Sequence, residues 1–102
     1  MTVLMTLRVA GDGKQLEAHV AEDSATISGV LETAKRHGVI SHRFYATDTE
    51  LLVLDQWPSE DAFNAFFKEE RPRIEQLMAH AGVRAEPVVT FWRQLETGDE
   101  VG

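Results

Sequence analysis

Apolar residues on both faces of the predicted strands constrain this chain more than any other feature of its sequence. Successive side chains of a strand point to opposite faces of the sheet, yet residues 51–54, 88–89 and 91–92 are apolar throughout. A strand with one face in water would alternate apolar and polar residues. Both faces of the predicted sheet therefore need cover.

The order of the predicted elements indicates the fold. Apolar residues at helical spacing occupy the stretches between Gly13 and Gly38 and between Ser59 and Gly82. Strand-like runs cover residues 2–9, 39–46, 51–57 and 87–95. The resulting order predicts an α+β domain with the ferredoxin-like βαββαβ topology, in which both helical stretches cover one face of a four-stranded antiparallel sheet.

Two positions leave the continuity of the helices open. The polar residues 22–24 interrupt the first helical stretch, which is either one bent helix or two helices, the second capped by Ser24. Pro72 lies inside the second stretch, where it removes a backbone hydrogen bond and clashes with the preceding turn. We therefore expect a kink near residues 70–71, or a new helix that begins at Pro72.

The second face of the sheet is expected to be covered by another copy of the chain. Both helical stretches are needed to cover the first face, so neither is free to cover the second. Extended apolar surface is rarely left exposed in soluble proteins. The same face of a second copy is the simplest cover, which predicts a homodimer formed through the sheet. Residues 1–95 are expected to form a single domain, and the polar residues 96–102 a flexible tail.

Composition excludes several classes of function. The chain has 102 residues, no cysteine and a formal net charge of −7. Without cysteine it has no disulfide, thiolate metal site or cysteine nucleophile. It has no basic stripe of the kind that binds nucleic acid. No apolar run approaches the roughly 20 residues of a membrane span, and no signal-peptide pattern occurs. We expect a cytoplasmic protein without a nucleic-acid or membrane partner.

Histidine is the most promising catalytic residue type in this sequence. The four histidines, at positions 19, 37, 42 and 80, show no metal-binding spacing, and no dinucleotide fingerprint follows residues 11–13, so no metal or cofactor is expected. His42 lies on the same side of its predicted strand as Ile40 and Phe44. Burial there would keep it neutral and able to accept a proton. The alternative is a hydrogen-bonded structural histidine.

Bulky side chains either line a cavity for a planar ligand or fill the core. Asp55 and Gln56 interrupt an otherwise apolar strand, and one of them is expected to face the pocket. Asp55 could instead pair with Arg43 or Arg93 across neighbouring strands. The candidate pocket residues are Thr6, Phe44, Gln56, Trp57, Phe63, Phe66, Phe67, Met78 and Trp92.

Two segments, Gly38-Val-Ile-Ser-His-Arg-Phe-Tyr45 and residues 52–63, resemble the antibiotic biosynthesis monooxygenase-like family. Its members share a glycine before an aromatic strand, a second strand ending in Trp-x-Ser, and an Ala-Phe or Ala-Leu pair that opens the next helix. Residues 57, 59, 62 and 63 fit this pattern. The resemblance extends over the whole chain in element order and is specific over residues 38–67. It implies a homodimeric α/β barrel.

The same resemblance implies three kinds of function. Some members oxidise polycyclic phenols without metal or flavin, others degrade haem, and many have no assigned activity. Haem-degrading members carry asparagine, tryptophan and an iron-ligating histidine about where Thr6, Phe66 and Gln76 stand in this sequence. None of the three matches, so haem degradation is disfavoured.

Two hypotheses therefore remain. The chain is a non-catalytic dimer that binds a small hydrophobic or aromatic metabolite between helices and sheet, or it is a cofactor-independent monooxygenase for a phenolic polycyclic substrate. In the second case His42 would accept the phenolic proton, and neutral donors such as Thr6 or Gln56 would stabilise the anion. The mismatches with the family slightly favour the first.

Overall fold

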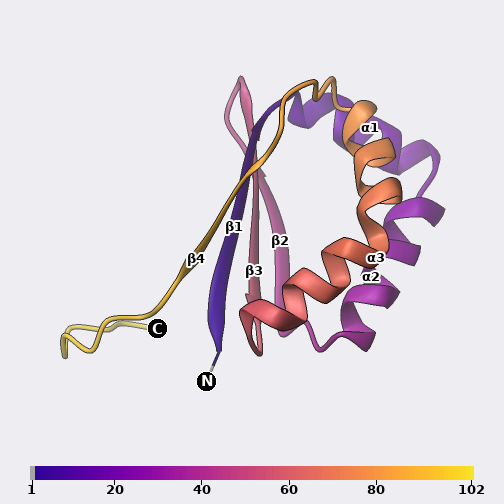
Figure 1. Cartoon of the computed structure of the whole chain (residues 1–102). Coiled ribbons are helices and arrows are strands. Elements are labelled where there is room, and N and C mark those ends of the chain that lie inside the picture. Colours follow the sequence, from indigo (N-terminus) through magenta and orange to yellow (C-terminus); the bar gives the residue numbers. More distant parts are fainter. Residues whose placement is uncertain (1) are drawn as a thin grey trace.

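A four-stranded antiparallel sheet carries three helices on one face (Figure 1). The computed structural model describes residues 2–102; Met1, which belongs to the expected domain, lies outside the described residues. The strands are β1 (Val3–Ala10), β2 (Ser41–Ala46), β3 (Glu50–Trp57) and β4 (Val88–Trp92), in the order β2-β3-β1-β4. The helices are α1 (Gly13–Glu22), α2 (Ala25–Arg36) and α3 (Glu60–Ala79). The predicted α+β, ferredoxin-like fold is confirmed.

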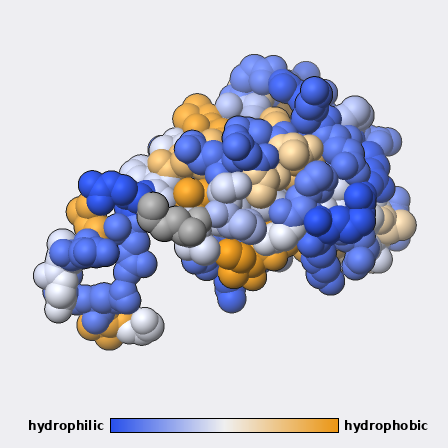
Figure 2. Space-filling view, turned by 60° about the horizontal axis from the view of Figure 1, so that its bottom comes forward, coloured by the Kyte–Doolittle hydropathy of each residue, from blue (hydrophilic) through white to orange (hydrophobic). Residues whose placement is uncertain are grey.

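The last strand is shorter than the sequence indicated. β4 pairs with β1 alone, from Val88 opposite Arg8 to Trp92 opposite Leu4. Since β1 begins at Val3, it offers little further backbone for residues 93–95 to pair with. The chain after β4 therefore leaves the sheet, and it extends away from the layers in Figures 1 and 2.

The first helical stretch consists of two helices. Asp23 ends α1 in an extended conformation, and its carboxylate accepts a hydrogen bond from the backbone N–H of Ala25 at 3.1 Å. Ser24, the expected cap of α2, has no side-chain capping bond among the described residues. Asp23 takes this role because an aspartate side chain readily bonds the backbone two residues further on.

The second helical stretch is a single helix with Pro72 inside it. The hydroxyl of Ser59 caps α3 by accepting a hydrogen bond from the backbone N–H of Ala62 at 3.1 Å. Figure 1 shows α3 bending midway, as expected where a proline interrupts the backbone hydrogen bonds. Of the two possibilities left open by the sequence, the kink occurs and the division does not.

The two faces of the sheet differ in their cover. The face under the helices holds the core residues Met5, Leu7, Val9, Leu51, Val53 and Trp57. None of the helices formed by residues 2–102 covers the second face, which we call the open face (Figure 1). Leu4, Tyr45, Val88 and Trp92 are exposed on it, and the indole Nε1 of Trp92 donates to Thr6 Oγ1 at 2.8 Å. The open face thus combines apolar and polar side chains.

A buried carboxylate joins α2 to α3. Glu70 is 3% exposed; it accepts hydrogen bonds from Thr33 Oγ1 of α2 at 2.7 Å and from Arg73 Nε at 2.6 Å. The Arg73 guanidinium is the main cause that lowers the pKa of Glu70 below its ordinary value, and it outweighs the opposing effect of burial. Glu70 is therefore an ionised link between the two helices.

Replacing Glu70 by Gln should lower the free energy of unfolding by about 1–3 kcal/mol near neutral pH, because Thr33 and Arg73 lose a charged acceptor. A carboxyl whose pKa is lowered by folding stabilises the protein above its unfolded pKa, and this contribution disappears as pH falls through the folded pKa. The stability difference between wild type and E70Q, measured by denaturant unfolding, should therefore shrink towards low pH. The exposed Glu75→Gln is the control and should cost less. A difference independent of pH would contradict this account.

Candidate functional site

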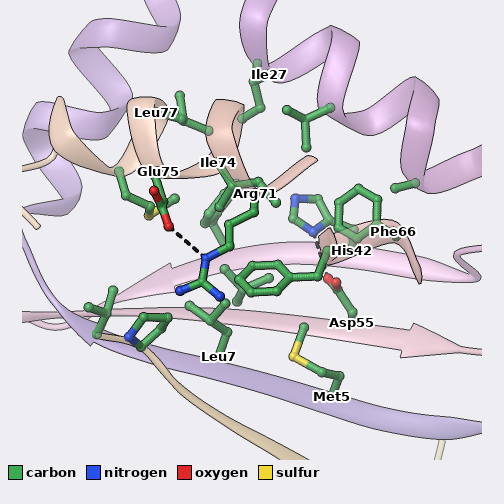
Figure 3. A pocket seen from close by; sticks show the side chains of 18 of the residues that line it. Met5, Leu7, Ile27, His42, Asp55, Phe66, Arg71, Ile74, Glu75 and Leu77 are labelled. Atoms are coloured by element: carbon green, nitrogen blue, oxygen red, sulfur yellow. Dashed lines mark hydrogen bonds and ion pairs between the residues drawn. The ribbon is translucent and has the colours of Figure 1, made fainter. Parts of the chain in front are cut away.

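A cavity of about 620 Å³ lies between the sheet and the helices α2 and α3. Its walls are largely apolar, and the side chains in Figure 3 reach it from both layers. The sheet contributes Met5, Leu7, Val9 and Val53, and the helices contribute Ile27, Val30, Leu31, Ile74 and Leu77. A cavity of this size and lining suits a small molecule with an apolar ring system.

The apolar wall of the cavity is interrupted by a polar point, formed by a histidine and a buried aspartate. His42 of β2 lies directly opposite Asp55 of β3, and both face the helices. His42 Nδ1 is 2.7 Å from Asp55 Oδ1, and Asp55 is only 4% exposed (Figure 3). Asp55 Oδ2 accepts a hydrogen bond from Trp57 Nε1 at 3.0 Å, so both carboxylate oxygens are engaged.

This arrangement determines what His42 can do. A carboxylate in its charged form only accepts hydrogen bonds, and against such a partner the imidazole carries its proton on Nδ1 and its lone pair on Nε2. The Trp57 indole holds the carboxylate in place, and the ring of Phe44 packs edge-on against the imidazole at a centroid distance of 4.9 Å. The imidazole of His42 is therefore held in one orientation in the wall of a largely apolar cavity.

The alternative considered for Asp55, an ion pair with Arg43 or Arg93, does not occur within the described residues. Arg43 lies opposite Leu54 and so points to the open face, and Arg93 follows the end of β4. His42 is the partner because it is the cross-strand neighbour of Asp55 on the same face. The relative register of β2 and β3 was the missing information, and it cannot be read from residue types alone.

The structure brings most of the expected site residues together. Those that line the cavity are His42, Phe44, Phe63, Phe66, Phe67 and Met78. Trp57 is fully buried against Phe63 and Phe66 and supports the wall from behind.

Thr6, Gln56 and Trp92 lie on the other side of the sheet. They alternate along their strands with Met5, Asp55 and Phe91, which face the helices. Their assignment to the pocket of this chain is therefore wrong, and so is the expectation that Thr6 or Gln56 stabilises an anion beside His42. The period of two in strand side chains places them there.

Sequence reasoning missed a second polar point of the cavity. Arg71 of α3 donates from Nε to Glu75 Oε1 at 2.8 Å and from Nη2 to Glu86 Oε2 at 3.3 Å. All three residues line the cavity, and the Arg71 guanidinium lies over the ring of Phe67 at 5.6 Å. The pKa of Arg71 is raised, chiefly by its hydrogen bond to Glu75. The spacing of four residues signals the ion pair, but its position at the cavity depends on tertiary packing.

The other histidines do not line the cavity. His19 and His80 stack on each other with ring centroids 3.7 Å apart, and His37 Nε2 lies 3.0 Å from Glu69. Within residues 2–102, no three histidine or carboxylate side chains are grouped as metal ligands. No helix in the described part of the chain is long and apolar enough to cross a membrane.

Solved structures with the same fold include several antibiotic biosynthesis monooxygenase-like proteins. SnoaB, a cofactor-independent oxygenase from Streptomyces nogalater, aligns with a TM-score of 0.61 and 14% identity over 97% of both chains. An antibiotic biosynthesis monooxygenase-like protein from Deinococcus radiodurans aligns with a TM-score of 0.65 and 14% identity over 98% of this chain and 99% of that one.

A third such protein, from Bordetella bronchiseptica, gives a TM-score of 0.63 and 10% identity over 93% of this chain and 98% of that one. No protein-family model and no curated protein matches the sequence. The resemblance stated from the sequence is thus confirmed for the fold.

The hydrogen bond to Asp55 should fix the tautomer of His42. Nitrogen chemical shifts measured by NMR above the histidine titration range should show His42 protonated on Nδ1. His37 is an internal control with the opposite expectation, because its Nε2 faces Glu69. Asp55→Ala should abolish the preference of His42 for the tautomer protonated on Nδ1, and it should leave the tautomer of His37 unchanged. A wild-type His42 protonated on Nε2 would contradict the proposed orientation.

Proposed function

We propose that this chain binds a small phenolic aromatic molecule in the cavity, removes a proton from it with His42, and so allows it to react with dioxygen. The observation that carries the proposal is the hydrogen bond between His42 and the buried Asp55 in the wall of an apolar cavity. A cavity used for binding alone has no need of an oriented base. The pair therefore favours the oxygenase hypothesis over the binding-only one.

The reaction needs no electrons from outside the substrate. When His42 Nε2 accepts the phenolic proton, the negative charge of the phenolate spreads onto ring carbons. One of these carbons forms a bond to dioxygen, and the protonated His42 returns its proton to the peroxide. The resulting hydroperoxide loses water and leaves a ring carbonyl, so that phenol and dioxygen give quinone and water. The activity named for SnoaB, cofactor-independent oxygenation, is of this class.

Asp55 acts in this scheme as a positioning residue. It holds the Nδ1 proton, directs Nε2 towards the ligand, and stabilises the imidazolium that forms when the phenolic proton is taken up. A substrate that fills the largely apolar cavity would displace water from it, which strengthens the attraction between the imidazolium and the phenolate. Phe63, Phe66 and Phe67 offer ring faces and edges to a planar substrate.

We also propose that a second copy covers the open face. Leu4, Tyr45 and Trp92 are exposed there on one chain, and Leu54 lies at the centre of the same face, between Thr6 and Arg43. The same face of a second chain would bury these side chains around a twofold axis. The cavity lies on the opposite side of the sheet, so each chain of the dimer keeps a complete His42–Asp55 pair.

The catalytic role of His42 can be separated from binding. Oxygen consumption and calorimetric binding are measured with a panel of hydroxylated naphthalenes and anthracenes. His42→Gln should keep the affinity within a few fold and lower turnover by about 10²–10⁴-fold. Val30→Trp, which fills the cavity, should abolish binding. His37→Gln is the control and should behave like the wild type.

Each other outcome has a definite meaning. Binding without turnover by the wild type would leave the binding-only function. If His42→Gln turned over as fast as the wild type, His42 would not be the base. If no member of the panel bound, the proposal would be overturned.

The dimer is tested by light scattering coupled to size exclusion. The wild type should have twice the 11.4 kDa mass of one chain at micromolar concentration. Leu54→Arg should give a folded monomer, because it places a charge at the centre of the proposed interface. Ala18→Arg, on the exposed surface of α1, should remain dimeric. A monomeric wild type would contradict the proposed interface.

A further inference from the structure

The cavity has two polar points, and the proposed function uses only one of them, His42 with Asp55. The second point is the guanidinium of Arg71, which extends from α3 towards the sheet beside Leu7 (Figure 3). Its side chain is about half exposed (49%), and the guanidinium lies over the ring of Phe67 at the edge of the cavity. A ligand that contacts His42 and fills the cavity therefore meets a cation as well.

Arg71 presents one edge of its guanidinium to the cavity. Its Nε is used by Glu75 on the next turn of α3 at 2.8 Å, which fixes the plane of the group. The terminal edge formed by Nη1 and Nη2 remains, and its one contact in the described part of the chain is the bond of Nη2 to Glu86 at 3.3 Å. Two parallel N–H groups on such an edge match the two oxygens of a carboxylate.

Glu86 is a weak occupant of this edge. Its bond is the longer of the two, its side chain is 84% exposed, and it belongs to the loop between α3 and β4. Exposed ion pairs of this kind contribute little, so a ligand group can displace Glu86 at small cost. A ligand carboxylate that accepts from both Nη1 and Nη2 makes a paired, charge-assisted contact, which is stronger than the single bond of Glu86.

The overall charge makes such a contact necessary for an acidic ligand. The chain has a net charge of −7, which disfavours an anion over most of its surface. Two further arginines border the cavity. Arg43 points to the open face by its position in β2, and Arg84 lies in the loop after α3, whereas Arg71 belongs to α3 and is held by its bond to Glu75. Arg71 is the arginine placed over the cavity wall.

We propose that the aromatic ligand carries a carboxylate and that Arg71 is the residue that selects it. The proposal rests on the proposed function and adds a substrate class to it: aromatic acids with a hydroxyl group. The carboxylate binds the Nη1 and Nη2 edge of Arg71, and the ring system fills the apolar space. The two polar points then fix the direction in which the ligand lies and turn its hydroxyl towards His42.

The test compares a hydroxynaphthoate with its methyl ester by titration calorimetry. The two probes share the ring and the hydroxyl and differ in charge. Wild type should bind the acid about 10- to 100-fold more tightly than the ester, the range expected for hydrogen bonds to a charged group. Arg71→Gln should remove this preference and leave the affinity for the ester within about twofold. Arg71→Lys should keep only part of the preference, because it retains the charge without the paired donors.

Two further variants sharpen the result. Glu86→Gln removes the competitor for the guanidinium edge and should tighten binding of the acid but not of the ester. Lys68→Gln removes one positive charge from the same helix outside the cavity, and it should leave both affinities unchanged. Thermal unfolding of each variant verifies that it is folded.

Different binding results would overturn the role of Arg71 and the proposed function. If the ester binds as tightly as the acid, or if Arg71→Gln weakens both probes equally, the assignment of Arg71 is overturned while the aromatic-binding function stands. If wild type binds neither probe nor any member of the phenol panel, both fail together.

Discussion

The alternation of side chains across one sheet governs this molecule. Helices cover a single face, so every strand residue lies either in the layer that holds the cavity or on the open face. β2 and β3 each contribute one polar residue, His42 and Asp55, to an otherwise apolar inner layer, and their register places the two in contact at 2.7 Å. A shift of either strand by one residue would move its polar side chain to the open face and remove the pair.

The contact between His42 and Asp55 matters chemically because Asp55 is buried. A carboxylate at 4% exposure must be hydrogen-bonded to be tolerated, and Asp55 meets this requirement through His42 and Trp57. The same bond thus gives the buried carboxylate a hydrogen-bond partner and orients the imidazole of His42. Glu70 follows the same rule between α2 and α3, but it lies away from the cavity and serves the packing of the helices.

The sequence was sufficient for the element order and the fold, and it indicated that His42 faces the helices, because these depend on periodicity and on the alternation of strand side chains. It was insufficient where register or tertiary packing decides. Thr6, Gln56 and Trp92 were assigned to the pocket on residue type, although their strand positions put them opposite the buried residues. Arg71 reaches the cavity because α3 packs over the sheet, and residue spacing does not contain that geometry.

The proposed reaction requires an aromatic hydroxyl to meet His42 Nε2 inside the cavity. A crystal structure with a bound hydroxynaphthalene would show whether it does. We expect the rings between the sheet and α3, with the hydroxyl oxygen within about 2.6–3.2 Å of Nε2, the distance required for proton transfer. A ligand bound on the open face, or a cavity closed by its own side chains, would contradict it.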